Sequence, residues 1–287
     1  MSTFLRILPV LVGVNLLSGC AVEQYGEDDV GEAESALLTT NTLTTNTLTT
    51  NTLTTNTLTT NTLTTNTLTT NTLTTNGAGA PVLQALSLST PEGEANRAVF
   101  HYLVTCALDP SQSVTYSYTD AQGTAHTVTE TGAIGLASYW ATGPLDDQGK
   151  AYVSACIATR INYYGVTVDI SLRADIDVLS ANTTAYELGA YSYIEGAFWG
   201  NLFSDKPYLH SCYRDENVDH SRAAQRECAA GHVRDDGRIE ECGAIHIVGS
   251  CTNVCRKLWK DGGYYTECGL DADPGTASGA LITVGLR

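Results

Sequence analysis

The stretch LDDQGKAYVSACIATRIN, residues 145–162, gives the clearest indication of the fold. Its pattern is that of a helix, with Asp146 and Asp147 in the first turn and Arg160 near the end, where the helix dipole favours them. We therefore expect a helix over the whole stretch. Cys156 lies inside it, so a disulfide from this residue would fasten the helix to another element.

The segment before this stretch predicts a second helix and a hairpin. Apolar residues at positions 99, 100, 103, 104 and 107 give residues 96–108 helical spacing. Residues 113–118 and 124–129 alternate and flank the turn sequence Asp-Ala-Gln-Gly, as in a β-hairpin. Cys106 ends the first helix, and no cysteine other than Cys106 and Cys156 lies between residues 81 and 195, so we expect a disulfide between the two helices.

The rest of the pattern predicts an α+β fold. Residues 166–172 alternate as a strand, and residues 188–194 suggest another. After Gly196 the periodicity fades, and Cys, Gly and charged residues dominate. We therefore expect a small mixed α+β domain over residues 81–195 and a disulfide-rich loop extension over residues 196–287.

The nine cysteines divide into Cys20 and eight others. An even number in an exported chain predicts four disulfides, because the compartments of the cell envelope favour oxidation. One is the bridge between the helices, and the six cysteines after residue 211 predict three more. The candidates are Cys106, Cys156, Cys212, Cys228, Cys242, Cys251, Cys255 and Cys268.

Some of the same cysteines have the spacing of zinc ligands. Export favours disulfides over this alternative, and we expect no metal and no cofactor. The three spacings are Cys228-x₃-His232, Cys242-x₃-His246 and Cys251-x₃-Cys255.

The N-terminus predicts export and a lipid anchor. Arg6 precedes a short apolar segment, Ile7 to Leu17, which is typical of a signal peptide and too short to span a membrane. The following Leu-Ser-Gly-Cys resembles the bacterial lipobox. This resemblance implies that residues 1–19 are removed and that Cys20 is acylated, with Ala21 indicating the outer membrane. A plain secretory signal with an incidental cysteine is the alternative.

A spacer follows the signal. Residues 20–37 form a linker with six acidic side chains and no basic one, which cannot form a core. Residues 38–76 repeat Leu-Thr-Thr-Asn-Thr, and a five-residue period places successive leucines about 140° apart on a helix, so no apolar stripe forms. An extended stalk and a square β-solenoid like the pentapeptide-repeat family both remain open. Residues 77–80, Gly-Ala-Gly-Ala, predict a hinge.

Composition excludes two classes of protein. With 15 basic and 31 acidic residues the net charge is −16, so no basic patch is expected and nucleic acid is excluded as a partner. After residue 20 no run of 18 apolar residues occurs, which excludes a polytopic membrane protein.

The segment EGAFWGNLF, residues 195–203, is the strongest candidate for a site. A carboxylate beside aromatic side chains and an amide predicts a sugar-binding platform on a loop, and Tyr163-Tyr164 is a similar aromatic pair. The alternative is a structural turn whose aromatics fill the core. The platform residues are Glu195, Phe198, Trp199 and Asn201.

Other polar clusters give weaker indications. Asp215, Asn217 and Asp219 match the first half of a calcium loop, but His220 replaces its glycine and Arg226 its final glutamate, which favours a solvated turn. The nearest approach to a catalytic cluster in the sequence is His210 with Asp219 and His220. Without a Gly-x-Ser-x-Gly motif, it gives no catalytic assignment.

Two segments resemble predicted lipoproteins of myxobacteria, which also tend to carry Asn-Leu-Thr-rich repeats. They are AYVSACIATRINYYGV (151–166), with Ser-Leu-Arg at 171–173, and the segment 195–203. The likeness covers most of residues 95–270 and implies an envelope location, but it brings no activity.

Three functions follow as hypotheses. The leading one is a non-enzymatic, surface-anchored outer-membrane lipoprotein that contacts the membrane through its lipid and binds a polysaccharide or another envelope protein. The second is a hydrolase of extracellular polymers that uses Glu195 with Asp146 or Asp147 as a carboxylate pair. The third is a structural spacer whose C-terminal domain only caps the stalk.

Overall fold

The computed structural model describes residues 86–164, 167–180, 182–204, 206–256, 258–259, 263–270 and 278–287, and the backbone of residues 38–41 and 43–44. The signal peptide, Cys20, the acidic linker, the hinge and most of the repeat lie outside the described residues. Those predictions therefore stay predictions, as does the choice between stalk and solenoid.

Two capped helices carry the first half of the fold. Helix α3 (Pro91–Ala107) begins with Pro91 in its first turn, and the Thr90 hydroxyl accepts a hydrogen bond from the Gly93 N–H. Helix α4 (Asp147–Thr159) begins where the Asp146 carboxylate accepts the Gly149 N–H at 2.7 Å. Both predicted helices are confirmed, with two differences at their ends. Helix α3 begins five residues earlier than the periodicity indicated, because its cap lies outside the apolar pattern. Helix α4 ends at Thr159 and not near Asn162, because Ile161 and Asn162 form the short strand β5.

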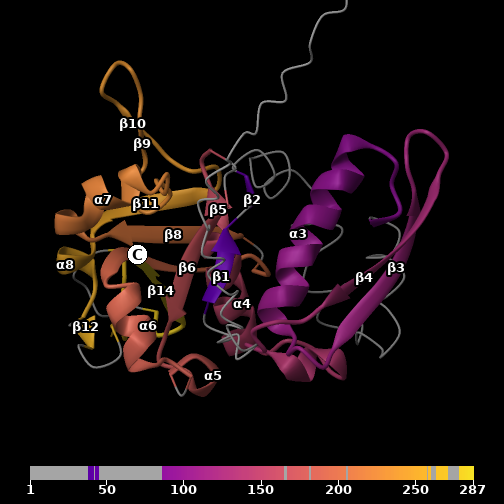
Figure 1. Ribbon diagram of the computed structural model, residues 1–287, viewed down its shortest axis with the longest axis horizontal. Helices are drawn as coiled ribbons and strands as arrows, with labels where there is room; N and C mark the ends of the chain where they lie inside the picture. The colour runs from indigo at the N-terminus through magenta and orange to yellow at the C-terminus, as the bar shows by residue number, and fades with distance from the viewer. Residues whose placement is uncertain are drawn as a thin grey trace, which may run out of the picture. The chain divides into compact units, whose positions relative to one another are not determined.

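The predicted hairpin is also confirmed. Strands β3 (Ser113–Thr119) and β4 (Ala125–Thr131) pair antiparallel. The Asp120 carboxylate accepts the Gln122 and Thr124 N–H groups, and Gly123 has a φ of +83°, which explains the glycine in this turn. The hairpin lies along α3 (Figure 1), with the Phe100 and Tyr116 rings edge to face at 5.8 Å.

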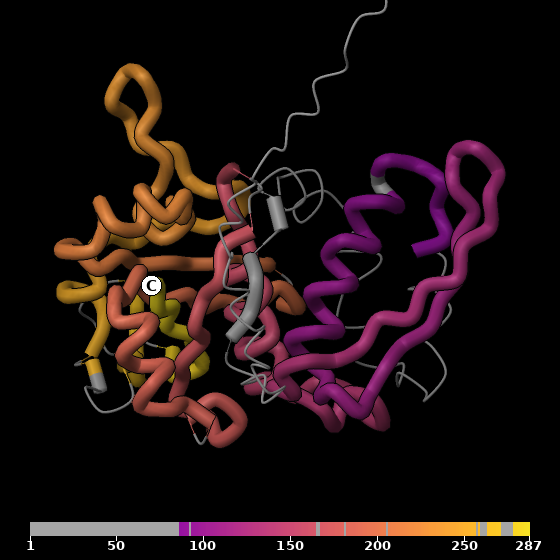
Figure 2. Tube along the Cα trace, in the orientation of Figure 1, coloured from indigo at the N-terminus to yellow at the C-terminus, as the bar shows by residue number. Residues whose placement is uncertain are grey.

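A six-stranded sheet forms the other half. Its order is β1-β6-β14-β7-β8-β11, antiparallel throughout except for the parallel pair β8 and β11. The last strand of the chain, β14, lies inside the sheet between β6 and β7; it is the yellow segment near the C-terminus in Figure 2. The bounds are β1 Leu38–Asn41, β6 Val168–Arg173, β7 Tyr193–Asn201, β8 Tyr208–Tyr213, β11 Ile245–Ser250 and β14 Leu281–Leu286.

Both faces of the sheet are covered. Alternate residues of a strand point to opposite faces, and Phe198 and Ile282 join the core cluster that contains α3 and α4, whereas Trp199 and Leu281 join a second cluster. The second cluster contains Cys212, Cys251 and Cys268. Disulfide-linked segments therefore form one of the two hydrophobic layers.

Short elements complete the described chain. The two-stranded sheets pair β2 with β5, β9 with β10 and β12 with β13. Their bounds are β2 Leu43–Thr44, β5 Ile161–Asn162, β9 His232–Val233, β10 Ile239–Glu240, β12 Leu258–Trp259 and β13 Tyr264–Tyr265; the short helices are η3 Ser138–Ala141, α5 Asp177–Ser180, α6 Ala185–Ala190, η4 Asp215–Asn217, α7 Val218–Ala223 and α8 Cys251–Val254.

The α+β class and the strand predicted over residues 166–172 are confirmed, but two local expectations are wrong. The strand predicted over residues 188–194 is wrong for residues 188–192, because Thr184 caps helix α6, which ends at Ala190, and β7 begins only at Tyr193. Residues 196–287 are richer in strands than the fading periodicity suggested. Strands covered on both faces do not alternate in hydrophobicity, and every residue of β14 is buried.

The four predicted disulfides are confirmed, including the bridge between α3 and α4. The pairings also decide between disulfides and zinc ligands at the three Cys-x₃-His and Cys-x₃-Cys spacings, because every cysteine of those motifs is bonded to another cysteine. Within the described residues, no helix has the length and apolarity needed to cross a membrane. The pairs are Cys106–Cys156, Cys212–Cys251, Cys228–Cys242 and Cys255–Cys268.

Candidate functional site

The predicted sugar-binding segment lies inside the domain. Residues 195–201 belong to the sheet strand β7 and not to a loop. Glu195, Phe198 and Trp199 are at most 2% exposed, and half-buried Asn201 accepts the Phe203 N–H at the turn that follows. The two aromatics pack in the core on opposite faces of the sheet, as the structural alternative predicted. These side chains form no exposed platform.

A bulge determines where Glu195 points. The pairing of β7 with β14 shifts register between Val284 and Gly285. Ile194 and Ala197 consequently join the same hydrophobic cluster, although strict alternation would place them on opposite faces. The extra residue of the bulge releases Glu195 from the alternation and lets its carboxylate meet Arg226.

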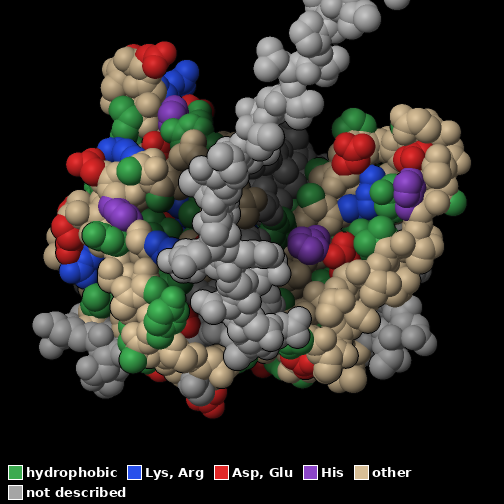
Figure 3. Space-filling model, viewed as in Figure 1, with side chains coloured by type: hydrophobic (Ala, Val, Ile, Leu, Met, Phe, Trp, Pro, Cys, Tyr) green, Lys and Arg blue, Asp and Glu red, His purple; other side chains and the backbone are tan. Residues whose placement is uncertain are grey.

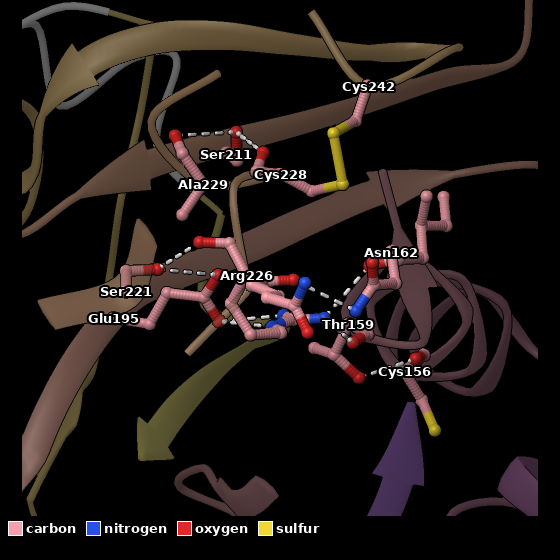
Figure 4. A network of polar contacts seen from close by, with 12 residues as sticks. Cys156, Thr159, Asn162, Glu195, Ser211, Ser221, Arg226, Cys228, Ala229 and Cys242 are labelled. Carbon is pink, nitrogen blue, oxygen red and sulfur yellow. Dashed lines mark hydrogen bonds and ion pairs between the residues drawn. A yellow bond between two sulfur atoms is a disulfide. The ribbon is translucent and has the colours of Figure 1, made fainter. Parts of the chain in front are cut away.

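Glu195 and Arg226 form a fully buried ion pair (Figure 4). Both Nε and Nη2 of the guanidinium donate to Glu195 Oε2, at 3.1 and 2.6 Å. Nη1 donates to the carbonyl oxygens of Thr159 and Ile161, at 3.1 and 2.8 Å. The pair therefore joins β7 to the end of α4, and its charge and hydrogen bonds are satisfied internally.

The segment around Arg226 is held at several further points. The Ser221 hydroxyl donates to the Arg226 carbonyl, and the Asn162 amide donates to the carbonyl of Gln225, which has a φ of +56° (Figure 4). The Ser211 hydroxyl contacts the carbonyls that follow at Cys228 and Ala229. We interpret this network as structural, because its side chains are buried from any substrate.

The carboxylates of the hydrolase hypothesis each have another role. Asp146 caps α4 and accepts a hydrogen bond from the Tyr139 hydroxyl at 2.7 Å. Hydrogen bonds from the Gly149 N–H and then from Tyr139 lower the pKa of Asp146, which is the opposite of what a general acid requires. Asp147 pairs with Lys150 at the surface, and Glu195 is buried on Arg226.

The calcium-like motif and the histidine cluster are also divided among structural contacts. Asp215 accepts the Ser250 hydroxyl, and Asn217 donates to the Ile194 carbonyl. His220 stacks on Tyr193 at 3.7 Å, whereas the contacts of His210 are with other rings on β7, β8 and β11. The described contacts do not bring these residues together as one site.

A half-exposed group of aromatic and acidic side chains lies elsewhere, and we call it the tyrosine–histidine patch. It consists of Tyr163, Tyr164, Glu227, His232 and Glu240. The rings of Tyr163 and His232 stack with centroids 4.0 Å apart, and Tyr164, 44% exposed, lies edge-on to His232 at 5.9 Å. The two carboxylates hold the rings, Glu240 through the Tyr163 hydroxyl at 3.2 Å and Glu227 through His232 Nδ1 at 2.5 Å.

Protonation keeps the two phenols of the patch as hydrogen-bond donors. Desolvation, and then the hydrogen bond to Glu240, raises the pKa of Tyr163. Desolvation and then Glu227 do the same for the pKa of Tyr164. The patch therefore offers ring faces, the exposed phenol of Tyr164 and the half-exposed carboxylate of Glu240 on one surface, whereas Glu227 is buried beneath them. This combination suits a polyhydroxylated ligand.

Charge over the surface agrees with the composition. Figure 3 shows acidic side chains scattered over the visible face, with the Lys and Arg side chains dispersed among them. The Tyr163-Tyr164 pair was visible in the sequence, but its partners were not, because Glu227, His232 and Glu240 come from segments more than 60 residues further along the chain.

Compared with protein-family models, curated proteins and solved structures, the chain has no match.

Proposed function

We propose that this chain is a lipid-anchored outer-membrane protein of the cell envelope that binds a partner and catalyses no reaction. One observation carries the proposal. The four disulfides account for every cysteine except Cys20, and that odd cysteine occupies the lipobox position. Disulfides suit an exported chain, and an unpaired cysteine in such a chain needs another chemical use.

The partner that we propose is a neutral polysaccharide, bound at the tyrosine–histidine patch. Sugar rings stack on aromatic faces, and carboxylates accept hydrogen bonds from sugar hydroxyls. A net charge of −16 and two carboxylates in the patch disfavour an acidic polymer by repulsion. An envelope protein as partner is the competing outcome of the binding test.

The anchor is tested with the full precursor expressed in a diderm bacterium. Wild-type protein should sediment with outer membranes and enter the detergent phase of a Triton X-114 separation, whereas Cys20→Ser should lose both properties because it has no thiol to acylate. Ser18→Ala is the matched control, since it keeps a small residue in the lipobox. Retention of Cys20→Ser in the membrane would contradict the proposal.

The partner is tested with the full chain in mild detergent on an array of neutral and acidic glycans. We expect binding to neutral glycans, and Tyr164→Ala should weaken it about fivefold by removing an exposed ring, since one aromatic contact contributes about 1 kcal/mol. Tyr186→Ala is the control, because Tyr186 is a 78% exposed tyrosine on α6 outside the patch. No glycan binding together with a cross-linked envelope protein would replace the polysaccharide by a protein partner.

A further inference from the structure

Two histidines face each other on the parallel strands β8 and β11. His210 and His246 are direct partners in the register, so their side chains leave the same face of the sheet. Their ring centroids are 5.8 Å apart, with an angle of 75° between the rings. Among the ring contacts of the described residues, this is the one pair formed by two histidines.

The contacts of His246 leave one ring nitrogen available. Its Nδ1 lies 2.9 Å from Glu241 Oε1, and that carboxylate also accepts the Ile247 N–H at 3.0 Å, which fixes it in place. A carboxylate on one imidazole nitrogen is the arrangement that orients a histidine toward a metal through the other. The His246 side chain is 62% exposed, so Nε2 is open to solvent ions.

His210 supplies the less accessible side of the pair. Its Nδ1 is buried and has no hydrogen-bond partner among the described residues. The rings of Trp199 and Tyr208 lie 5.8 and 5.1 Å from the His210 ring, so its orientation is restricted by packing. A buried nitrogen without a partner is uncommon, and it points to a ligand that the protein alone does not supply.

The spacing of the rings suits a shared ion. Imidazole nitrogens bind zinc at about 2.0–2.1 Å, and two such ligands on one ion place their ring centres roughly 5–6 Å apart. We propose that His210 and His246 bind a divalent transition-metal ion of the Cu²⁺, Ni²⁺ or Zn²⁺ class, with Glu241 as the positioning residue of His246. Imidazole is a favoured ligand of all three ions, and water completes the coordination. The site is independent of the polysaccharide proposal.

The test titrates Cu²⁺ into the full chain and follows it by calorimetry and electron paramagnetic resonance. Wild-type protein should bind one tight equivalent with nitrogen hyperfine splitting from two imidazoles. His246→Ala should weaken binding by at least about tenfold and leave one such nitrogen, and Glu241→Gln should weaken it about 10- to 100-fold, as loss of an outer-shell partner does. His126→Ala is the control, because His126 is paired with Asp120 but contacts no second histidine in the described structure.

A second measurement uses the wild-type chain alone. Ni²⁺ should broaden the imidazole NMR signals of His210 and His246 before those of His126. Absence of a tight equivalent, an equal loss of affinity in His126→Ala, or uniform broadening of all the histidines would each reduce the site to adventitious surface binding and overturn the proposal.

Discussion

At the scale of single residues, the buried pair of Glu195 and Arg226 is the most consequential interaction in the described structure. Both side chains have no solvent exposure, and four hydrogen bonds from the guanidinium join β7 to the end of α4. Attraction between two buried charges roughly offsets their desolvation, whereas one charge left alone is strongly unfavourable. The structure therefore depends on both partners being present together.

Removing one partner should destabilise the fold. Glu195→Leu should lower the free energy of unfolding by about 3–5 kcal/mol, because it leaves a buried, uncompensated guanidinium. Adding Arg226→Met should recover part of that loss, and urea unfolding of both variants measures the difference. Arg238→Ala is the control; its partner Asp236 is exposed, so the change should leave the urea midpoint nearly unchanged. A double variant that is no more stable than Glu195→Leu would contradict the coupling.

Asp146 gives a prediction that depends on pH. Hydrogen bonds from Gly149 and Tyr139 lower its pKa in the folded state, so its carboxylate stabilises the fold fully above its unfolded pKa of about 4 and loses this effect as pH falls through the folded pKa. Asp146→Ala should lower stability by about 1 kcal/mol at pH 7.

Asp146→Asn separates the cap from the charge. It should retain most of the stability at pH 7, because an asparagine also caps a helix, but its thermal unfolding temperature should fall less than that of wild type between pH 5 and pH 2. Equal slopes for the two proteins would show that this carboxylate does not contribute to the acid sensitivity.

At the scale of elements, local signals decided what could be predicted. Both long helices and the hairpin have caps, turn residues and periodicity within their own sequence, and the structure confirms them. Strands β7 and β14 lack alternation because they are covered on both faces, so nothing local identified them. For the same reason residues 195–201, whose aromatics suggested an exposed loop, form part of a central strand instead.

The bridge between α3 and α4 is an element-scale prediction. Cys106 and Cys156 close a loop with a sequence separation of 50 residues, and in the chain-entropy account such a bridge restricts the unfolded state by roughly 2–5 kcal/mol. The double variant Cys106→Ala, Cys156→Ala should therefore have a free energy of unfolding that is lower by this amount, and a lower urea midpoint. Its far-ultraviolet circular dichroism should stay unchanged. An unchanged urea midpoint would show that the bridge adds nothing to the contact between the helices.

At the scale of the whole molecule, the sheet joins segments that are far apart in the chain. The boundary predicted between residues 195 and 196 falls inside strand β7. The sheet takes strands from both sides of this boundary, because β14 pairs with β6 as well as with β7, and β11 pairs with β8. The tyrosine–histidine patch and the histidine pair likewise combine residues distant in sequence. Spacing along one chain could not reveal them, because the three-dimensional pairing of strands brings them together.

Eight of the nine cysteines form the disulfides of the domain, and the function we propose assigns the ninth, Cys20, to the lipid anchor. The most direct test is the intact mass of protein extracted from native membranes and alkylated without reduction. The mature chain should begin at an acylated Cys20 and take up no alkylating agent on the other eight cysteines. An unacylated Cys20, or alkylation of any of the eight before reduction, would contradict it.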